Sequence, residues 1–98
     1  MTMDKIVNGA EMTITLNGRL DTNTAPKLEM ELKESISGIE ELILDFSALE
    51  YLSSAGLRVL LAAQKIMNRQ GRMVIRNVNE MIMDVFDVTG FCDILTIE

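Results

Sequence analysis

The hydrophobic repeat of this chain alternates between the period of a β-strand and the period of an α-helix. The segment Met12–Asn17 alternates apolar and polar residues without exception, which is the pattern of a strand with one buried face. Further along, Leu28, Leu32 and Ile36 recur at helical spacing. Strands that alternate with helices pair in parallel through right-handed crossovers. The pattern therefore predicts an α/β layered domain.

The same patterning predicts a mixed β-sheet of about five strands with about three helices. The first two strands form an antiparallel hairpin that turns at Gly9–Glu11. The third is an apolar run that is typical of a central strand covered on both faces. The expected strands are Asp4–Val7, Met12–Asn17, Leu42–Phe46, Met73–Ile75 and Ile94–Ile97.

Residues suited to helix ends indicate where the three helices begin and stop. The first begins near Thr24 and Pro26 and ends at Gly38, and the second runs from Ser54 to about Arg69. The third ends at Thr89–Gly90, and the residues that mark its start, Asn77 and Glu80, have the spacing of a capping box. Among the eight methionines, Met73 and Met81 fall on apolar faces, so we expect them to fill the core.

Length and charge limit the number of domains and the kind of partner. The 98 residues suit one domain, spanning residues 1–98, and 48% hydrophobic residues suffice to bury a core. The formal net charge of −6 argues against binding to nucleic acid or to an anionic membrane surface. We find no signal peptide, and the longest apolar run, Val59–Ala63, is too short to span a bilayer. We expect a soluble cytoplasmic protein.

The chain lacks most of the groups on which enzymes depend. It has no histidine, which is the usual general base near neutral pH and the commonest metal ligand. Its one cysteine, Cys92, cannot form an internal disulfide or a cysteine-rich zinc site. The glycines form no phosphate-binding loop, and the carboxylates do not cluster as metal ligands do. We therefore expect no catalytic residue, no metal and no cofactor.

Two consecutive hydroxyl residues, Ser53 and Ser54, stand where the second helix begins. The first backbone N–H groups of a helix lack intrahelical partners, so a hydroxyl at this place can cap the helix. The helix dipole also makes a phosphate acceptable there. A phosphoserine would add about −1.5 to −2 charges. The position of these serines alone is compatible with a plain helix cap and with a phosphorylation switch, and it favours the plain cap.

Two separated segments resemble the STAS domains of bacterial anti-sigma factor antagonists. The segment Ser53–Leu57 matches the family's Asp-Ser-Ser/Thr/Ala-Gly-Leu region, and Asp45–Ser47 precedes it where the family has a strand ending in Asp-x-Ser. The segment Gly18–Leu28 matches the family's Gly-x-Leu-Asp-x-x-Thr-Ala-x-x-Leu pattern. The order of strands and helices agrees as well. The resemblance covers nearly the whole chain.

This resemblance implies a protein that binds an ATP-using anti-sigma factor serine kinase and thereby frees a sigma factor. Ser54 matches the phosphoacceptor of the family. Phosphorylation by the kinase abolishes binding in the family, and a metal-dependent serine phosphatase restores the active form. The residues that match the partner-contacting region are Asp21, Thr22, Asn23, Ser53, Gly56, Leu57 and Arg58. The alternatives to partner contact are that Thr22 or Asn23 only helps to start a helix, and that Arg58 is only a solvent-exposed charged residue on a helix.

The chain departs from the family at two places. Ser53 replaces an Asp that many relatives carry before the acceptor, which removes a carboxylate from the kinase target and offers a second hydroxyl. Many relatives also have a further helix after the last strand, so we expect an exposed apolar patch that could recruit a partner or a second copy in a homodimer. The alternative functions are a non-phosphorylated STAS adaptor or scaffold subunit of another cytoplasmic assembly, and a small-molecule sensor.

Overall fold

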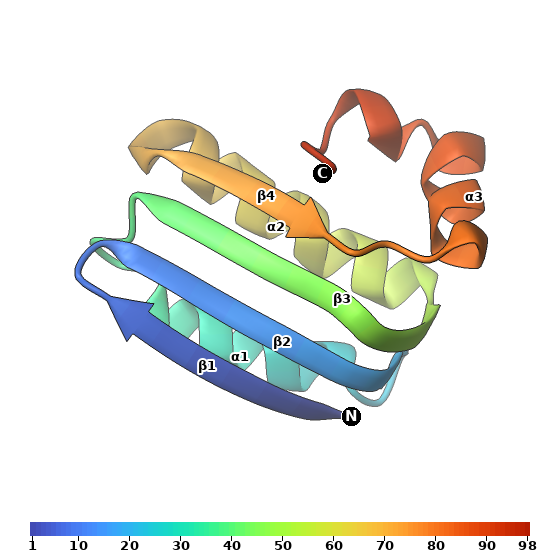
Figure 1. The fold of residues 1–98 in the computed structure, drawn as a ribbon, viewed down its shortest axis with the longest axis horizontal. Coiled ribbons are helices and arrows are strands. Elements are labelled where there is room, and N and C mark those ends of the chain that lie inside the picture. Colours follow the sequence, from blue (N-terminus) through green and yellow to red (C-terminus); the bar gives the residue numbers. More distant parts are fainter.

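A four-stranded sheet with two helices on one face forms the body of the protein in the computed structural model, which describes residues 1–98 (Figure 1). The strands lie in the order β1-β2-β3-β4, with β1 antiparallel to β2 and the other neighbours parallel. The mixed α/β sheet is therefore confirmed. The elements are β1 (Thr2–Asn8), β2 (Glu11–Leu20), α1 (Ala25–Ser35), β3 (Glu41–Leu52), α2 (Ser54–Gln70), β4 (Arg72–Arg76), α3 (Glu80–Thr89) and the short 3-10 helix η1 (Phe91–Asp93).

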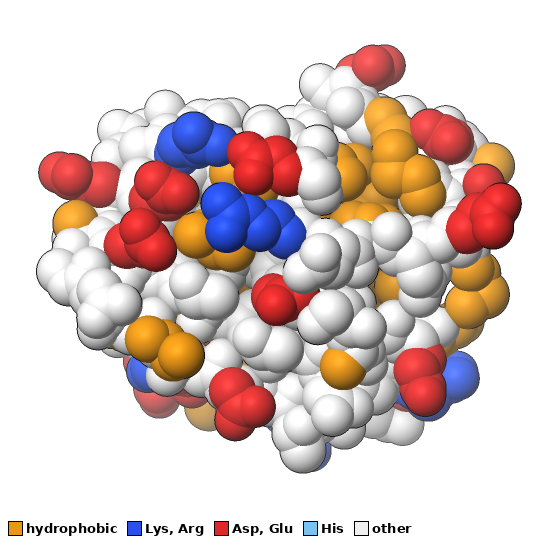
Figure 2. Space-filling model, in the orientation of Figure 1, with side chains coloured by type: hydrophobic (Ala, Val, Ile, Leu, Met, Phe, Trp, Pro, Cys, Tyr) orange, Lys and Arg blue, Asp and Glu red, His pale blue; other side chains and the backbone are white.

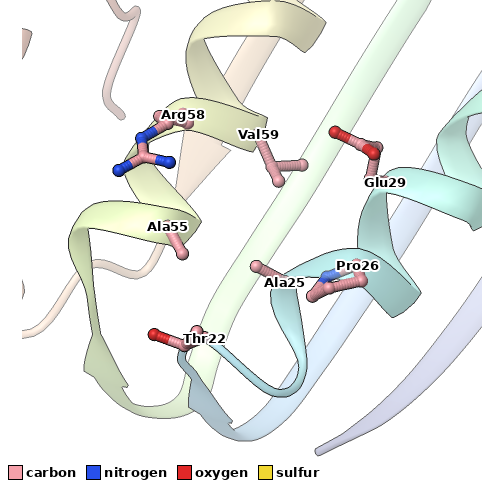
Figure 3. A pocket seen from close by; sticks show the side chains of 7 residues that line it. All are labelled: Thr22, Ala25, Pro26, Glu29, Ala55, Arg58 and Val59. Carbon is pink, nitrogen blue, oxygen red and sulfur yellow. The ribbon is translucent and has the colours of Figure 1, made fainter.

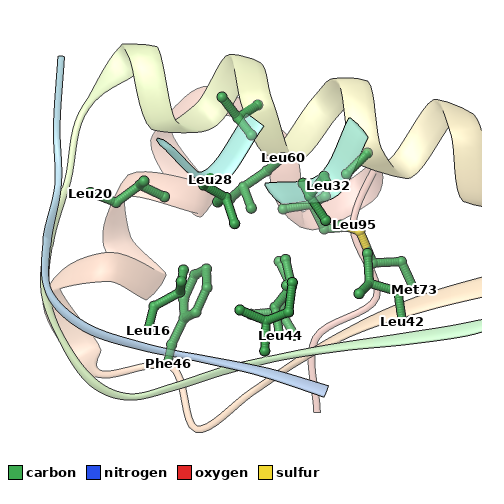
Figure 4. Packing of buried hydrophobic residues seen from close by; sticks show 14 of the residues in the cluster. Leu16, Leu20, Leu28, Leu32, Leu42, Leu44, Phe46, Leu60, Met73 and Leu95 are labelled. Carbon is green, nitrogen blue, oxygen red and sulfur yellow. The ribbon is translucent and has the colours of Figure 1, made fainter. Parts of the chain in front are cut away.

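The core lies between the sheet and the helices α1 and α2 (Figure 4). The alternation seen in the sequence places one side of each strand inward, so β2 contributes Met12, Ile14 and Leu16, all fully buried. The helix α3 and η1 lie on the β4 side of the sheet and complete the core there (Figure 1). None of the helices is both long and apolar enough to cross a membrane. The facing core residues are Leu28, Leu32, Leu42, Leu44, Phe46, Leu60, Met67, Met73, Ile82, Phe86 and Leu95.

The strand β3 is central, as predicted, but it extends six residues beyond the predicted end at Phe46. Two register shifts relative to β2, between Thr15 and Asn17 and between Gly18 and Arg19, each add one residue to β3. Such bulges break the two-residue alternation and increase the local twist. Buried residues consequently recur every third position from Phe46 to Leu52, which hides the second half of the strand from a search for alternation.

The predicted fifth strand, Ile94–Ile97, is reduced to a single parallel bridge between Ile97 and Ile75. Two backbone hydrogen bonds hold it, from Ile75 N–H to the Thr96 carbonyl and from Glu98 N–H to the Ile75 carbonyl, both 2.9 Å. The preceding N–H groups of Ile94 and Leu95 donate back to Phe91. Because Ile94 and Leu95 are still bonded to the start of η1, too little extended chain is left for a strand.

Two predictions about α3 are wrong in detail. Asn79 rather than Asn77 caps the helix, with its side-chain oxygen accepting from Ile82 N–H at 2.8 Å. Asn77 instead adopts a left-handed conformation with φ 60°, which asparagine tolerates better than most residues. Met81 is 56% exposed, whereas Met73 is buried as expected. The apolar stripe of α3 is wider than the face of the helix that contacts the sheet. The positions of the stripe outside that face, including Met81, are therefore exposed.

Candidate functional site

The parallel pairing of β2 and β3 brings the two motif segments together at one edge of the sheet. Leu20 and Leu52 are register partners at the carboxyl ends of these strands. Just beyond them, Ser53 N–H donates to the Leu20 carbonyl at 2.9 Å. The loop after β2 therefore lies beside the first turn of α2 (Figure 3). Residues that are some thirty positions apart in the sequence form one surface.

The two serines of this surface have different roles. Ser53 is the N-cap of α2, and its Oγ accepts a hydrogen bond from Gly56 N–H at 3.3 Å. Ser54 is the first helical residue; its side chain is exposed and its hydroxyl makes no hydrogen bond within the protein. The cap expected at this helix start is thus supplied by Ser53, and the Ser54 hydroxyl is left accessible.

The first turn of α2 packs closely onto the ends of both strands. A Cβ atom on Gly56 would lie 2.6 Å from Leu52 Cδ1 and 2.9 Å from Leu20 Cγ, so any larger residue would force these buried leucines to shift. Leu57 is 8% exposed and belongs to the core. Of the predicted contact residues, Gly56 and Leu57 therefore position the helix from inside and do not present a side chain to a partner.

Asp21 shapes the neighbouring loop from within. Its Oδ1 accepts hydrogen bonds from the N–H groups of Asn23 at 2.9 Å and Thr24 at 3.0 Å. Desolvation opposes ionisation of Asp21, but these bonds and the nearby Arg19 outweigh it and lower the pKa of the carboxyl below its usual value. The negative charge of Asp21 is therefore stabilised by N–H groups of its own loop.

The remaining predicted residues lie on the surface. Thr22 and Asn23 are exposed at the tip of the loop, and α1 begins after Thr24, so neither of them starts that helix. Even Thr24 does not cap α1 with its side chain, because its hydroxyl oxygen accepts from Asp21 N–H at 2.8 Å and its proton is donated to the Arg19 carbonyl at 2.7 Å. The tip of the loop is thus free to contact another molecule.

A shallow groove runs between the first turns of α1 and α2 (Figure 3). Thr22 lies at its end, and the exposed side chains of Glu29 and Arg58 flank it from α1 and α2. Arg58 makes no ion pair within the protein. The first turn of α2 has no acidic residue, so no carboxylate of that turn neutralises the positive end of the helix dipole at Ser54.

Two residues that the motif did not indicate lie close to this surface. The guanidinium carbon of Arg19 lies 4.1 Å from the ring centroid of Tyr51, in a cation–π arrangement. They are register partners on β2 and β3 and both are exposed. Only the register of the bulged pair, which the sequence does not reveal, brings them together. Tyrosine and arginine are both enriched at protein interfaces relative to the rest of the surface.

Comparison with known proteins covers both segments of the site. The STAS domain family model matches residues 2–98. BtrV of Bordetella bronchiseptica, which is named as an anti-sigma factor antagonist, is 35% identical over 99 residues, covering 99% of this chain and 84% of BtrV. The anti-sigma F factor antagonist of Paenibacillus polymyxa is 29% identical over 89 residues, covering 88% and 76% of the two chains. The phosphorylated form of the Bacillus cell fate determinant SpoIIAA has the same fold, with a TM-score of 0.77 at 19% identity over 99% of this chain and 91% of SpoIIAA.

Proposed function

The chain belongs to the STAS domain family of anti-sigma factor antagonists, and we propose that it is an antagonist gated by phosphorylation of Ser54. In its unmodified form it binds an anti-sigma factor serine kinase in the bacterial cytoplasm and so releases a sigma factor. It acts as a single STAS-like domain and is a substrate rather than an enzyme. The observation that carries the proposal is the exposed, unbonded hydroxyl of Ser54 beside a serine that already caps the helix.

The division of roles between the serines favours Ser54 as the acceptor. A kinase needs a hydroxyl that can enter its active site, and the Ser54 side chain is exposed. Ser53 is half-buried and accepts from Gly56 N–H, so its modification would disturb the helix cap. A phosphate on Ser54 instead stands at a helix N-terminus, where negative charge is stabilised. The fold can therefore keep its structure while the charge of the surface changes.

The change in charge explains how the switch would work. The unmodified surface offers an unpaired Arg58 and the exposed loop tip Thr22–Asn23, which suit a partner with an acidic or neutral contact. A phosphate adds about −1.5 to −2 charges and competes for Arg58. A like-charged group juxtaposed in an interface costs several kcal/mol. The kinase is thereby expelled, and removal of the phosphate by a serine phosphatase restores binding.

The proposal is tested by phosphorylation with a cognate kinase. Incubation with the kinase and ATP is expected to add one phosphate, which mass spectrometry of peptides places on Ser54. The variant Ser53→Ala is the matched control, because it also loses a hydroxyl at the helix start but keeps the acceptor. An unchanged mass, or full modification of Ser54→Ala, contradicts the assignment.

A constitutive adaptor or scaffold subunit is the second candidate function. The observation that favours it is Ser53, which replaces the Asp found in many relatives and leaves no carboxylate in the first turn of α2. In that case the same surface binds a partner regardless of charge at position 54. The variant Ser54→Asp separates the two functions, since a scaffold would bind its partner as tightly as the wild type does.

A further inference from the structure

The outward face of α3 exposes a row of apolar side chains. Met81 is 56% exposed and Val88 87% exposed, with the half-buried Val85 between them. Positions separated by three and four residues lie on one face of a helix, so the three side chains form a continuous stripe. The stripe borders a shallow hollow that Asp84 and Thr89 also line. We call this set, Met81, Asp84, Val85, Val88 and Thr89, the α3 surface.

The net negative charge of the protein is concentrated in the segment that contains α3. The segment of residues 77–98 has no lysine or arginine, and its acidic residues are Glu80, Asp84, Asp87, Asp93 and Glu98. Of these, Glu98 alone forms ion pairs, with Arg72 and Arg76. Figure 2 shows hydrophobic side chains gathered over the α3 part of the molecule, on the right, with acidic side chains around them. Four carboxylates of this segment thus have no cation inside the protein to neutralise them, and Asp84 lines the hollow beside the stripe.

We propose that the α3 surface docks a basic amphipathic segment of a partner protein. The apolar side of such a segment would lie on Met81, Val85 and Val88, and its lysines or arginines would meet the carboxylates of α3. Helices recognised in this way place apolar anchors at intervals of three and four residues, which match the stripe. Methionine adapts its shape to different apolar partners. None of these residues belongs to the Ser54 surface, so the inference goes beyond the proposed switch.

Charge complementarity decides between a basic segment and the other occupants. A second copy related by a two-fold axis would place the same carboxylates against each other, because such an interface uses one patch on both subunits. An anionic membrane surface would repel them as well. A basic segment alone gains both from burial of the stripe and from its charges.

The test uses a synthetic peptide as the probe. The full chain is titrated into an ~18-residue peptide of leucine and lysine that has its leucines on one helical face and carries a fluorescent label, and binding is followed by the anisotropy of the label. A peptide of leucine and glutamate with the same pattern, and one of serine and lysine with the same charge, are the matched peptides. We expect only the leucine–lysine peptide to bind. The double variant Met81→Ser, Val88→Ser should weaken that binding by about tenfold, since truncating central anchors has effects of this size.

Two further variants complete the test. Asp84→Asn with Asp87→Asn should also weaken binding severalfold, and the asparagine at position 87 keeps an acceptor for the Cys92 thiol. Met30→Ser removes a 63% exposed methionine from α1 and should leave binding unchanged. The proposal is overturned if the serine–lysine peptide binds equally well or if the Met81 and Val88 variant retains full affinity. Dimerisation through α3, seen by sedimentation equilibrium and lost in that variant, would show instead that a second copy is the occupant.

Discussion

The two ends of the sheet are held together in different ways. At the amino ends of the parallel strands, backbone meets backbone: Glu40 N–H donates to the Ala10 carbonyl at 2.7 Å, and Arg72 N–H donates to the Glu40 carbonyl at 2.9 Å. Gln70 closes this end through its amide, which donates to the carbonyls of Ile36 and Ile39 at 2.7 and 2.6 Å. The backbone groups named here are thus all paired within the protein, mostly with one another.

At the carboxyl ends, side chains hold the loops. Asp21 organises the loop after β2, Ser53 caps α2, and Asn79 caps α3 while its amide donates to the Leu49 carbonyl at 3.0 Å. Parallel sheets in α/β proteins bind ligands at this end. The comparison indicates that the fold is fixed at one end and that the other end presents the Ser54 surface.

The largest expected effect comes from the same substitution made at each end. A Cβ on Gly71 would lie 1.8 Å from the Glu40 carbonyl oxygen, which is backbone and cannot move aside. A Cβ on Gly56 would instead meet leucine side chains, which can shift. We expect Gly71→Ala to lower the free energy of unfolding by more than about 3 kcal/mol and Gly56→Ala by about 1–3 kcal/mol.

Urea denaturation measures both values. A larger loss for Gly56→Ala than for Gly71→Ala would show that the amino end is the more adaptable one and would reverse the comparison.

A smaller effect is expected at the helix cap. Ser53→Ala removes the acceptor of Gly56 N–H and should cost about 1 kcal/mol of unfolding free energy. Ser53→Asp restores a capping oxygen and should be as stable as the wild type. Ser54→Ala, one residue later, should change stability little because the Ser54 hydroxyl makes no bond. Equal losses for Ser53→Ala and Ser54→Ala in thermal unfolding would refute the division of roles between the serines.

The smallest effect concerns acid sensitivity at the carboxyl end. The side-chain amide of Asn77, at 3.0 Å, and the N–H of Ser47 outweigh desolvation and lower the pKa of Asp45 below its usual value. Its folded pKa is lower than its unfolded one, so Asp45 contributes stability above about pH 4 that is lost as the pH falls through the folded pKa.

Unfolding measured from pH 7 downward tests this contribution. Asp45→Asn should flatten the acid limb of the stability curve, and so should Asn77→Gly, which keeps the left-handed backbone available while removing the amide. Slopes identical to that of the wild type in both variants would mean that Asp45 does not contribute.

The difference between the two ends of the sheet also explains which parts of the structure the sequence could predict. The carboxyl end depends on particular residue types, and the motif at Ser53–Leu57 revealed where the helix starts and which surface it forms. Apart from those of the Gln70 amide, the contacts of the amino end use backbone atoms that every residue has, so nothing in the sequence marks Glu40 and Gly71 as neighbours. The bulges in β3 escaped prediction for a related reason, because they remove the alternation by which strands are found.

The α3 region shows a further limit of prediction. Two asparagines, Asn77 and Asn79, are equally good caps by type, and only the path of the chain after β4 selects Asn79. The apolar stripe of α3 is wide enough for either of two faces to be buried. The position of β3 and β4 decides that Ile82 and Phe86 face inward and that Met81 and Val88 do not.

The most direct test of the account is the affinity of the anti-sigma factor kinase for protein synthesised with phosphoserine at position 54. We expect isothermal titration calorimetry to show binding about 100-fold weaker than for the unmodified protein. A loss of affinity of this size is expected when like charges face each other in an interface. Phosphoserine at position 37, which is exposed near the amino ends of the strands, should leave the affinity unchanged. Equal affinity of the kinase for the proteins modified at positions 54 and 37 would contradict a switch at the carboxyl end.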